Sequence, residues 1–218
     1  MLERHRFAFL GAVLLYVAAS VIFVLMAIPS GRDIVQRIDD AVFEFVQPLD
    51  VSILAGGALA LDFLGSVWVT LPVRLFVTGW LISRKRWEAM WAWIGAAVAS
   101  ELAITILKPL YGRERPPNPD VATTGFSFPS GHSVAGAVTA IALVIVLVPA
   151  GPRRRFLEVL AAYFAVFMGM SRVYVGAHWL SDAVAGVALG VGLAVGAAAV
   201  VHELGDRLYQ RRRERNAA

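Results

Sequence analysis

Six apolar runs constrain this chain more than any other feature. All but the fifth, which is short, are close to the roughly 20 residues that a helix needs to cross the hydrocarbon core of a membrane. Only 17% of the 218 residues are charged and 58% are hydrophobic, which leaves too few charges to cover a soluble surface. The runs therefore predict an all-α polytopic membrane protein, a bundle of six transmembrane helices. They lie at about 7–28, 66–83, 87–107, 133–149, 156–170 and 180–201.

No repeat or linker divides the chain, so we predict one membrane domain over residues 1–206 and a basic tail over 207–218. The first run resembles a signal peptide, but its 22 apolar residues exceed the usual length of the apolar region of a signal peptide. We therefore expect it to be kept. The segment at about 33–64 is amphipathic and then apolar. It is predicted to lie at the membrane interface or to dip partly into the membrane.

The basic residues predict the orientation of the chain. Thirteen of the 20 lysines and arginines cluster beside the span ends that a six-span layout places on one side. Cytoplasmic segments carry such an excess, so both termini are predicted to lie in the cytoplasm, with the chain in a bacterial inner membrane. Short clusters separated by apolar runs also disfavour nucleic acid as a partner. The outer side keeps six basic residues: Arg32, Arg37, Lys108, Arg113, Arg115 and Arg172.

Three segments on the predicted outer side carry groups that suit a phosphate. They are "KPLYGRERPP" (108–117), "PSGH" (129–132) and "SRVYVGAHWLSD" (171–182). Arginine and lysine form charge-assisted hydrogen bonds to phosphate oxygens. A glycine turn before a helix lets backbone amides approach an anion closely. Together the segments predict an extracytoplasmic phosphate site.

The third segment also carries a candidate nucleophile. His178 and Asp182 are four residues apart, so on a helix both side chains lie on one face. The carboxylate can then hold one imidazole N–H and stabilise positive charge on the ring. The other ring nitrogen is left free to attack a substrate.

The order of these motifs resembles a known signature. Lys-x6-Arg-Pro, then Pro-Ser-Gly-His, then Ser-Arg-x5-His-x3-Asp is similar to the three-part signature of the type 2 phosphatidic acid phosphatase family. That family shares a superfamily with bacterial acid phosphatases and vanadium haloperoxidases. The motifs extend over residues 108–182, and the six-span layout extends the resemblance over most of the chain. The matched positions are Lys108, Arg115, Pro116, Pro129, Ser130, Gly131, His132, Ser171, Arg172, His178 and Asp182.

The resemblance implies a hydrolase that acts on phosphoric ester or anhydride bonds. His178 would form a phosphohistidine intermediate, with Asp182 orienting it. His132 would protonate the leaving oxygen and then help to activate water. The family needs neither a metal nor another cofactor. The phosphate oxygens would be held by Lys108, Arg115, Ser130, Gly131 and Arg172.

The expected substrate is a lipid phosphate or diphosphate in the extracytoplasmic leaflet. Undecaprenyl diphosphate is predicted first, followed by phosphatidylglycerol phosphate and phosphatidic acid. The partners expected are this lipid and the surrounding membrane lipids, and no protein partner is inferred.

Two other classes of function remain open at this point. A transporter with an outer anion site would explain the cations but gives no reason for the His-x3-Asp pair. A zinc enzyme using His132, His178 and Asp182 would place the metal beside clustered cations, which is electrostatically unfavourable. Four charged residues outside the signature have no predicted role, although Glu101 could pair with Lys108 and Arg113 could contact a headgroup. They are Asp62, Arg74, Glu101 and Arg113.

Overall fold

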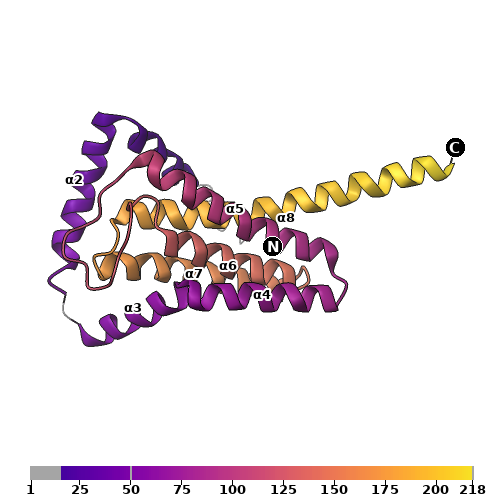
Figure 1. Cartoon of the computed structure of the whole chain (residues 1–218), viewed down its shortest axis with the longest axis horizontal. Coiled ribbons are helices and arrows are strands. Elements are labelled where there is room, and N and C mark those ends of the chain that lie inside the picture. The colour runs from indigo at the N-terminus through magenta and orange to yellow at the C-terminus, as the bar shows by residue number, and fades with distance from the viewer. Residues whose placement is uncertain (1–15, 50, 218) are drawn as a thin grey trace.

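The computed structural model describes residues 16–49 and 51–217. Every regular element in this part of the chain is an α-helix, which confirms the all-α prediction (Figure 1). A first helical segment covers Tyr16–Ala27. The other helices are α2 (Pro29–Val46), α3 (Ser52–Gly65), α4 (Val67–Ser83), α5 (Trp87–Tyr111), α6 (Gly131–Leu147), α7 (Pro152–Tyr174) and α8 (Leu180–Ala217).

Three described helices are long and apolar enough to cross a membrane, so the chain is an integral membrane protein. They are α5, α7 and the Leu180–Arg207 part of α8. A fourth crossing arises if α3 and α4, which meet at a bend of 48°, form one broken span. The first helical segment and α6 are apolar but shorter. The count of six spans therefore stays a prediction, and the start of its first span lies outside the described residues.

Helices α5 to α8 pack together, and α6 is the most enclosed of them (Figure 1). Two glycines of α8 allow its backbone to approach α6. A Cβ atom on Gly190 would lie 2.6 Å from the carbonyl oxygen of Val134, and one on Gly186 would lie 2.8 Å from the carbonyl oxygen of Ser130. Small residues at such positions permit close packing of membrane helices. Their effect here is to fix the start of α8 against the start of α6.

The helix ends at one end of the bundle carry the three sequence motifs. Helix α5 stops at Tyr111 because Gly112 adopts a left-handed conformation with φ of 56°. Helix α6 begins at Gly131, and the Ser130 hydroxyl caps it by accepting a hydrogen bond from the backbone N–H of Ser133. Helix α7 ends six residues before α8 begins, and His178 lies between them. Lys108, expected just beyond the third span, lies instead in the last turn of α5.

The segment at about 33–64 forms most of α2 and α3 rather than a single helix. Helix α2 is amphipathic: Val35 and Asp39 are buried, whereas Ile34, Ile38 and Phe45 are exposed. Its predicted place at the membrane interface is not tested by the structure.

The predicted ion pair between Glu101 and Lys108 is wrong. Glu101 does not pair with Lys108, because its carboxylate accepts a hydrogen bond of 2.6 Å from Arg74 of the neighbouring helix α4.

Candidate active site

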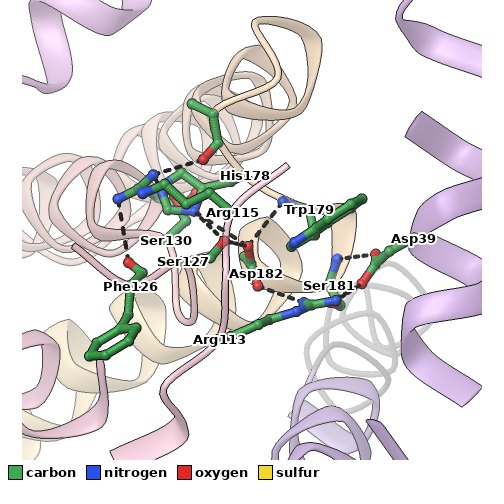
Figure 2. A network of polar contacts seen from close by, with 12 residues as sticks. Asp39, Arg113, Arg115, Phe126, Ser127, Ser130, His178, Trp179, Ser181 and Asp182 are labelled. Carbon is green, nitrogen blue, oxygen red and sulfur yellow. Dashed lines mark hydrogen bonds and ion pairs between the residues drawn. The ribbon is translucent and has the colours of Figure 1, made fainter. Parts of the chain in front are cut away.

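His178 lies in the short connection between α7 and α8, with its side chain 3% exposed. Its Nδ1 atom is 3.4 Å from Asp182 Oδ2 and 3.4 Å from the hydroxyl of Ser127 (Figure 2). Its Nε2 atom is 3.2 Å from a terminal nitrogen of Arg115. A guanidinium group can only donate hydrogen bonds. We therefore assign the proton to Nδ1 and a free electron pair to Nε2.

Burial lowers the pKa of His178 to about 4, although the hydrogen bond and the charge of Asp182 favour the protonated ring. The cations Arg115 and Lys108 lower it further. The imidazole is therefore neutral at pH 7. A neutral ring with a free Nε2 electron pair is the form that a nucleophile needs.

This lowered pKa predicts that His178 does not titrate near neutrality. An ordinary histidine has a pKa near 6.5 and takes up its proton as the pH falls through that value. We expect the ring resonances of His178 to stay those of a neutral imidazole from pH 8 down to pH 5.5. Nuclear magnetic resonance of histidine-labelled protein in detergent would measure this. The His178→Ala variant would identify the signal, and a midpoint between pH 6 and 7 would contradict the prediction.

Asp182 is held from several sides. Its Oδ2 atom accepts hydrogen bonds from the hydroxyl of Ser127 and, at 2.9 Å, from the backbone N–H of Trp179. Its Oδ1 atom accepts a hydrogen bond of 2.7 Å from Arg113. The carboxylate is fully buried. Buried charges are tolerated when they are paired and hydrogen-bonded in this way, so the group that faces His178 Nδ1 is fixed in place.

Three charged or titratable side chains meet where α3, α6 and α7 approach one another. His132 Nε2 lies 3.4 Å from Asp62 Oδ1, and the same oxygen accepts a hydrogen bond from Arg172. The Nε atom of Arg172 is buried and has no hydrogen-bond partner within the described part of the chain. A buried unpaired donor is costly. Arg172 can therefore still receive an oxygen of an anionic ligand.

Lys108 and Arg115 hold the loop before α6 against His178. The Lys108 ammonium donates to the carbonyl oxygen of Phe126. Arg115 donates hydrogen bonds of 2.7–2.9 Å to the carbonyl oxygens of Thr124, Gly125 and Ala177. Arg115 therefore positions this loop and also places its positive charge beside His178 Nε2.

Ser130 and Gly131 form the turn at the start of α6. The backbone N–H of Ser130 donates a 3.1 Å hydrogen bond to the carbonyl oxygen of Asp182, which ties this turn to the first turn of α8. Gly131 is partly exposed and is the first residue of α6. Free backbone N–H groups and the helix dipole favour an anion at such a position.

The structure thus brings the predicted histidines, Asp182 and the predicted phosphate-binding residues to one end of the bundle. Sequence reasoning missed Ser127 and Asp39, and it gave no role to Asp62 and Arg113. Ser127 lies three residues before Ser130, but no spacing rule distinguishes a serine that supports a carboxylate. The neighbours Asp39 and Asp40 differ only in which face of α2 they occupy, and the amphipathic pattern could have shown which one is buried.

Comparison with known proteins gives a consistent picture. The family model described as the PAP2 superfamily matches residues 89–206. Phosphatidylglycerophosphatase B of Bacillus subtilis is 28% identical over 179 residues, which is 78% of this chain and 86% of that protein. Lipid A 1-phosphatase of Rhizobium etli is 34% identical over 160 residues, or 62% of this chain and 65% of the relative. Undecaprenyl-diphosphatase of Sulfolobus acidocaldarius is 36% identical over only 67 residues, or 31% of this chain and 30% of that protein.

Two solved structures are similar. The transmembrane PAP2-type phosphatidylglycerolphosphate phosphatase of Bacillus subtilis superposes with a TM-score of 0.72 and 27% identity, covering 88% of this chain and 96% of that one. LpxE of Aquifex aeolicus gives a TM-score of 0.58 at 21% identity, over 72% of this chain and 92% of that one. The second likeness concerns the fold alone.

Proposed function

Because this chain belongs to the PAP2 superfamily and is a hydrolase of phosphate esters, we propose that it dephosphorylates a membrane lipid through a phosphohistidine at His178. The observation that carries this proposal is the His178 ring. Its free Nε2 electron pair lies beside Arg115, and its Nδ1–H faces the buried carboxylate of Asp182. This arrangement provides a nucleophile, a nearby cation for the phosphate and a carboxylate that stabilises the charged ring.

The first chemical step forms the phosphoenzyme. Nε2 of His178 attacks phosphorus, the bond from phosphorus to the lipid oxygen breaks, and His132 donates its proton to that oxygen. The attacking ring becomes positively charged, and Asp182 stabilises it through Nδ1–H. Arg115 and Arg172 stabilise the charge on the transferring phosphoryl oxygens in this proposal.

The second step releases phosphate. A water molecule gives a proton to the now neutral His132 and attacks phosphorus. The bond from phosphorus to Nε2 breaks, and its electron pair returns to His178. His178 is then neutral and His132 is protonated, so the cycle closes without a metal or another cofactor.

For the substrate, we propose phosphatidylglycerol phosphate as the first lipid to test. The sequence alone had placed undecaprenyl diphosphate first. The Bacillus phosphatidylglycerophosphatase, however, matches 78% of this chain and its structural counterpart 88%, whereas the undecaprenyl-diphosphatase relative matches 31%. Undecaprenyl diphosphate and phosphatidic acid are the alternatives. A transporter is not favoured, because the related proteins are named as phosphatases.

For the location, we propose a bacterial inner membrane with both termini in the cytoplasm and the site on the extracytoplasmic side. The support is the distribution of basic residues, 13 of 20 of which lie on the predicted inner side.

The decisive test measures phosphate release by the purified protein in detergent with EDTA present. We expect a kcat/KM for phosphatidylglycerol phosphate about tenfold or more above that for phosphatidic acid and undecaprenyl diphosphate, since a site that hydrogen-bonds a headgroup discriminates against lipids that lack it. Activity lost to EDTA and restored by zinc would favour the zinc enzyme. No release from any of the three lipids would overturn the proposal.

A further inference from the structure

A buried chain of charges lies behind the proposed nucleophile. Arg113 donates a 2.6 Å hydrogen bond to Asp39 Oδ2 and a 2.7 Å hydrogen bond to Asp182 Oδ1 (Figure 2). The side chains of Asp39, Arg113 and Asp182 are 1%, 7% and 0% exposed. One guanidinium group therefore bridges two buried carboxylates, and only Asp182 also faces His178.

Asp39 also holds the first turn of α8. Its Oδ1 atom accepts a 2.9 Å hydrogen bond from the backbone N–H of Ser181, and its Oδ2 atom accepts one from the Ser181 hydroxyl. The guanidinium of Arg113 lies 5.5 Å from the ring centre of Trp179. Asp39 thus fixes both Arg113 and the residue next to Asp182.

We propose that Asp39 and Arg113 are positioning residues that keep Asp182 available to the nucleophile. The proposal rests on the phosphohistidine function above. Without Asp39, the positive charge of Arg113 would be balanced by Asp182 alone. The Asp182 carboxylate would then stabilise a charged His178 ring less well. Asp39 supplies the second negative charge, so the three residues together keep one net negative charge to set against the imidazolium that forms during attack.

The support for the nucleophile comes from outside the region that the family model matches. Asp39 belongs to α2, whereas the family model matches only residues 89–206. A face of α2 next to the one that carries Asp39 is apolar and exposed, with exposed fractions of 46%, 58% and 73% for Ile34, Ile38 and Phe45. A helix with such a face suits a membrane interface. The nucleophile is therefore supported by an N-terminal helix outside the matched region.

The test compares Asp39→Asn with Asp33→Asn. Both changes remove one negative charge from α2 without changing its shape, but Asp33 is exposed and outside the network. We expect Asp39→Asn to lower kcat by about 10- to 100-fold, the size of loss known for residues that hold a metal-binding histidine or carboxylate in place. KM should stay within about threefold, because the side-chain hydrogen bonds of Asp39 and Arg113 reach none of the predicted phosphate-binding residues.

A second readout separates positioning from general damage. Orthovanadate adopts the five-coordinate geometry of a phosphoryl-transfer transition state, whereas inorganic phosphate resembles the product. We expect Asp39→Asn to weaken inhibition by vanadate in proportion to its loss of kcat and to leave inhibition by phosphate unchanged. Equal weakening of both inhibitors, or a kcat equal to that of Asp33→Asn, would overturn the positioning role.

A third variant covers the case in which Asp39→Asn does not fold. Arg113→Lys keeps the charge but loses the planar fork that spans two carboxylates, and we expect the same selective loss of kcat and vanadate binding. An Arg113→Lys variant with wild-type kcat would also overturn the proposal. Wild-type protein that releases no phosphate would instead refute the proposed function, so the two failures can be told apart.

Discussion

Replacing His178 with alanine should lower kcat for phosphate release by about 10⁴-fold or more, because the change removes the proposed nucleophile. The structure places no second imidazole beside Arg115 in the described part of the chain, since His132 faces Asp62. The fold should survive, because the change removes a ring without adding a charge. Release of phosphate and the midpoint of thermal unfolding in detergent would measure the two effects.

His202→Ala is the matched control for this variant. His202 is 72% exposed and pairs with Glu88 at the other end of the bundle, so its loss should leave kcat unchanged. Wild-type protein quenched in base during turnover of a ³²P-labelled substrate should retain label, because phosphohistidine survives base and decomposes in acid. His178→Ala should retain none. Labelled His178→Ala, or a kcat within tenfold of wild type, would exclude His178 as the nucleophile.

Replacing His132 with alanine should have the second largest effect, and its size should depend on the leaving group. General acid catalysis contributes about 10²- to 10⁴-fold when the departing oxygen needs a proton. We therefore expect kcat/KM for an alkyl phosphate to fall by about that factor, because its leaving group would otherwise depart as an unstable alkoxide. The loss in kcat/KM, which reports only the step that forms the phosphoenzyme, should be less than about tenfold for p-nitrophenyl phosphate, since nitrophenolate departs without a proton.

Comparing kcat/KM for the two esters tests this role of His132 directly. A lipid diphosphate should behave like the aryl ester, because its leaving group is itself a phosphate. Equal losses on alkyl and aryl esters would mean that His132 binds the phosphoryl group instead of protonating the leaving oxygen.

The arrangement of the signature residues could be anticipated from the sequence. The connections after the third and fifth apolar runs lie on one side of the membrane in a six-span layout. These connections carry Arg115, His132 and His178. The packing of α5 to α8 against one another then brings these connections to the same end of the bundle, as the structure shows. Their catalytic roles remain predictions that the variants above would test.

The supporting residues could not be anticipated in the same way. Their contacts join residues far apart in the chain: 74 and 142 positions for Asp39, 70 and 110 positions for Asp62, and 55 positions for Ser127. No periodicity or short motif encodes such pairings. In the sequence Asp62 resembles an isolated charge in an apolar segment, whereas in the fold Arg172 lies beside it.

The number of membrane spans does not follow from hydropathy alone, so the count of six stays a prediction. Hydropathy responds to how apolar a segment is, and not to what surrounds it. Helix α6 is apolar because it is enclosed by α5, α7 and α8, and it has only 17 residues. The bend of 48° between α3 and α4 likewise leaves the apolar pattern unbroken. A helix enclosed within a bundle and a helix that faces lipid can therefore have the same hydropathy.

The carboxylate of Asp62 has a bearing on how quickly the product leaves. Arg172 already donates a hydrogen bond to Asp62, so a phosphate ion at this arginine shares the guanidinium with a group that is part of the protein. The attraction between Arg172 and phosphate is then weaker than it would be at an uncompensated arginine. We expect inorganic phosphate to be a weak inhibitor for this reason, which suits an enzyme that must release its product after every lipid.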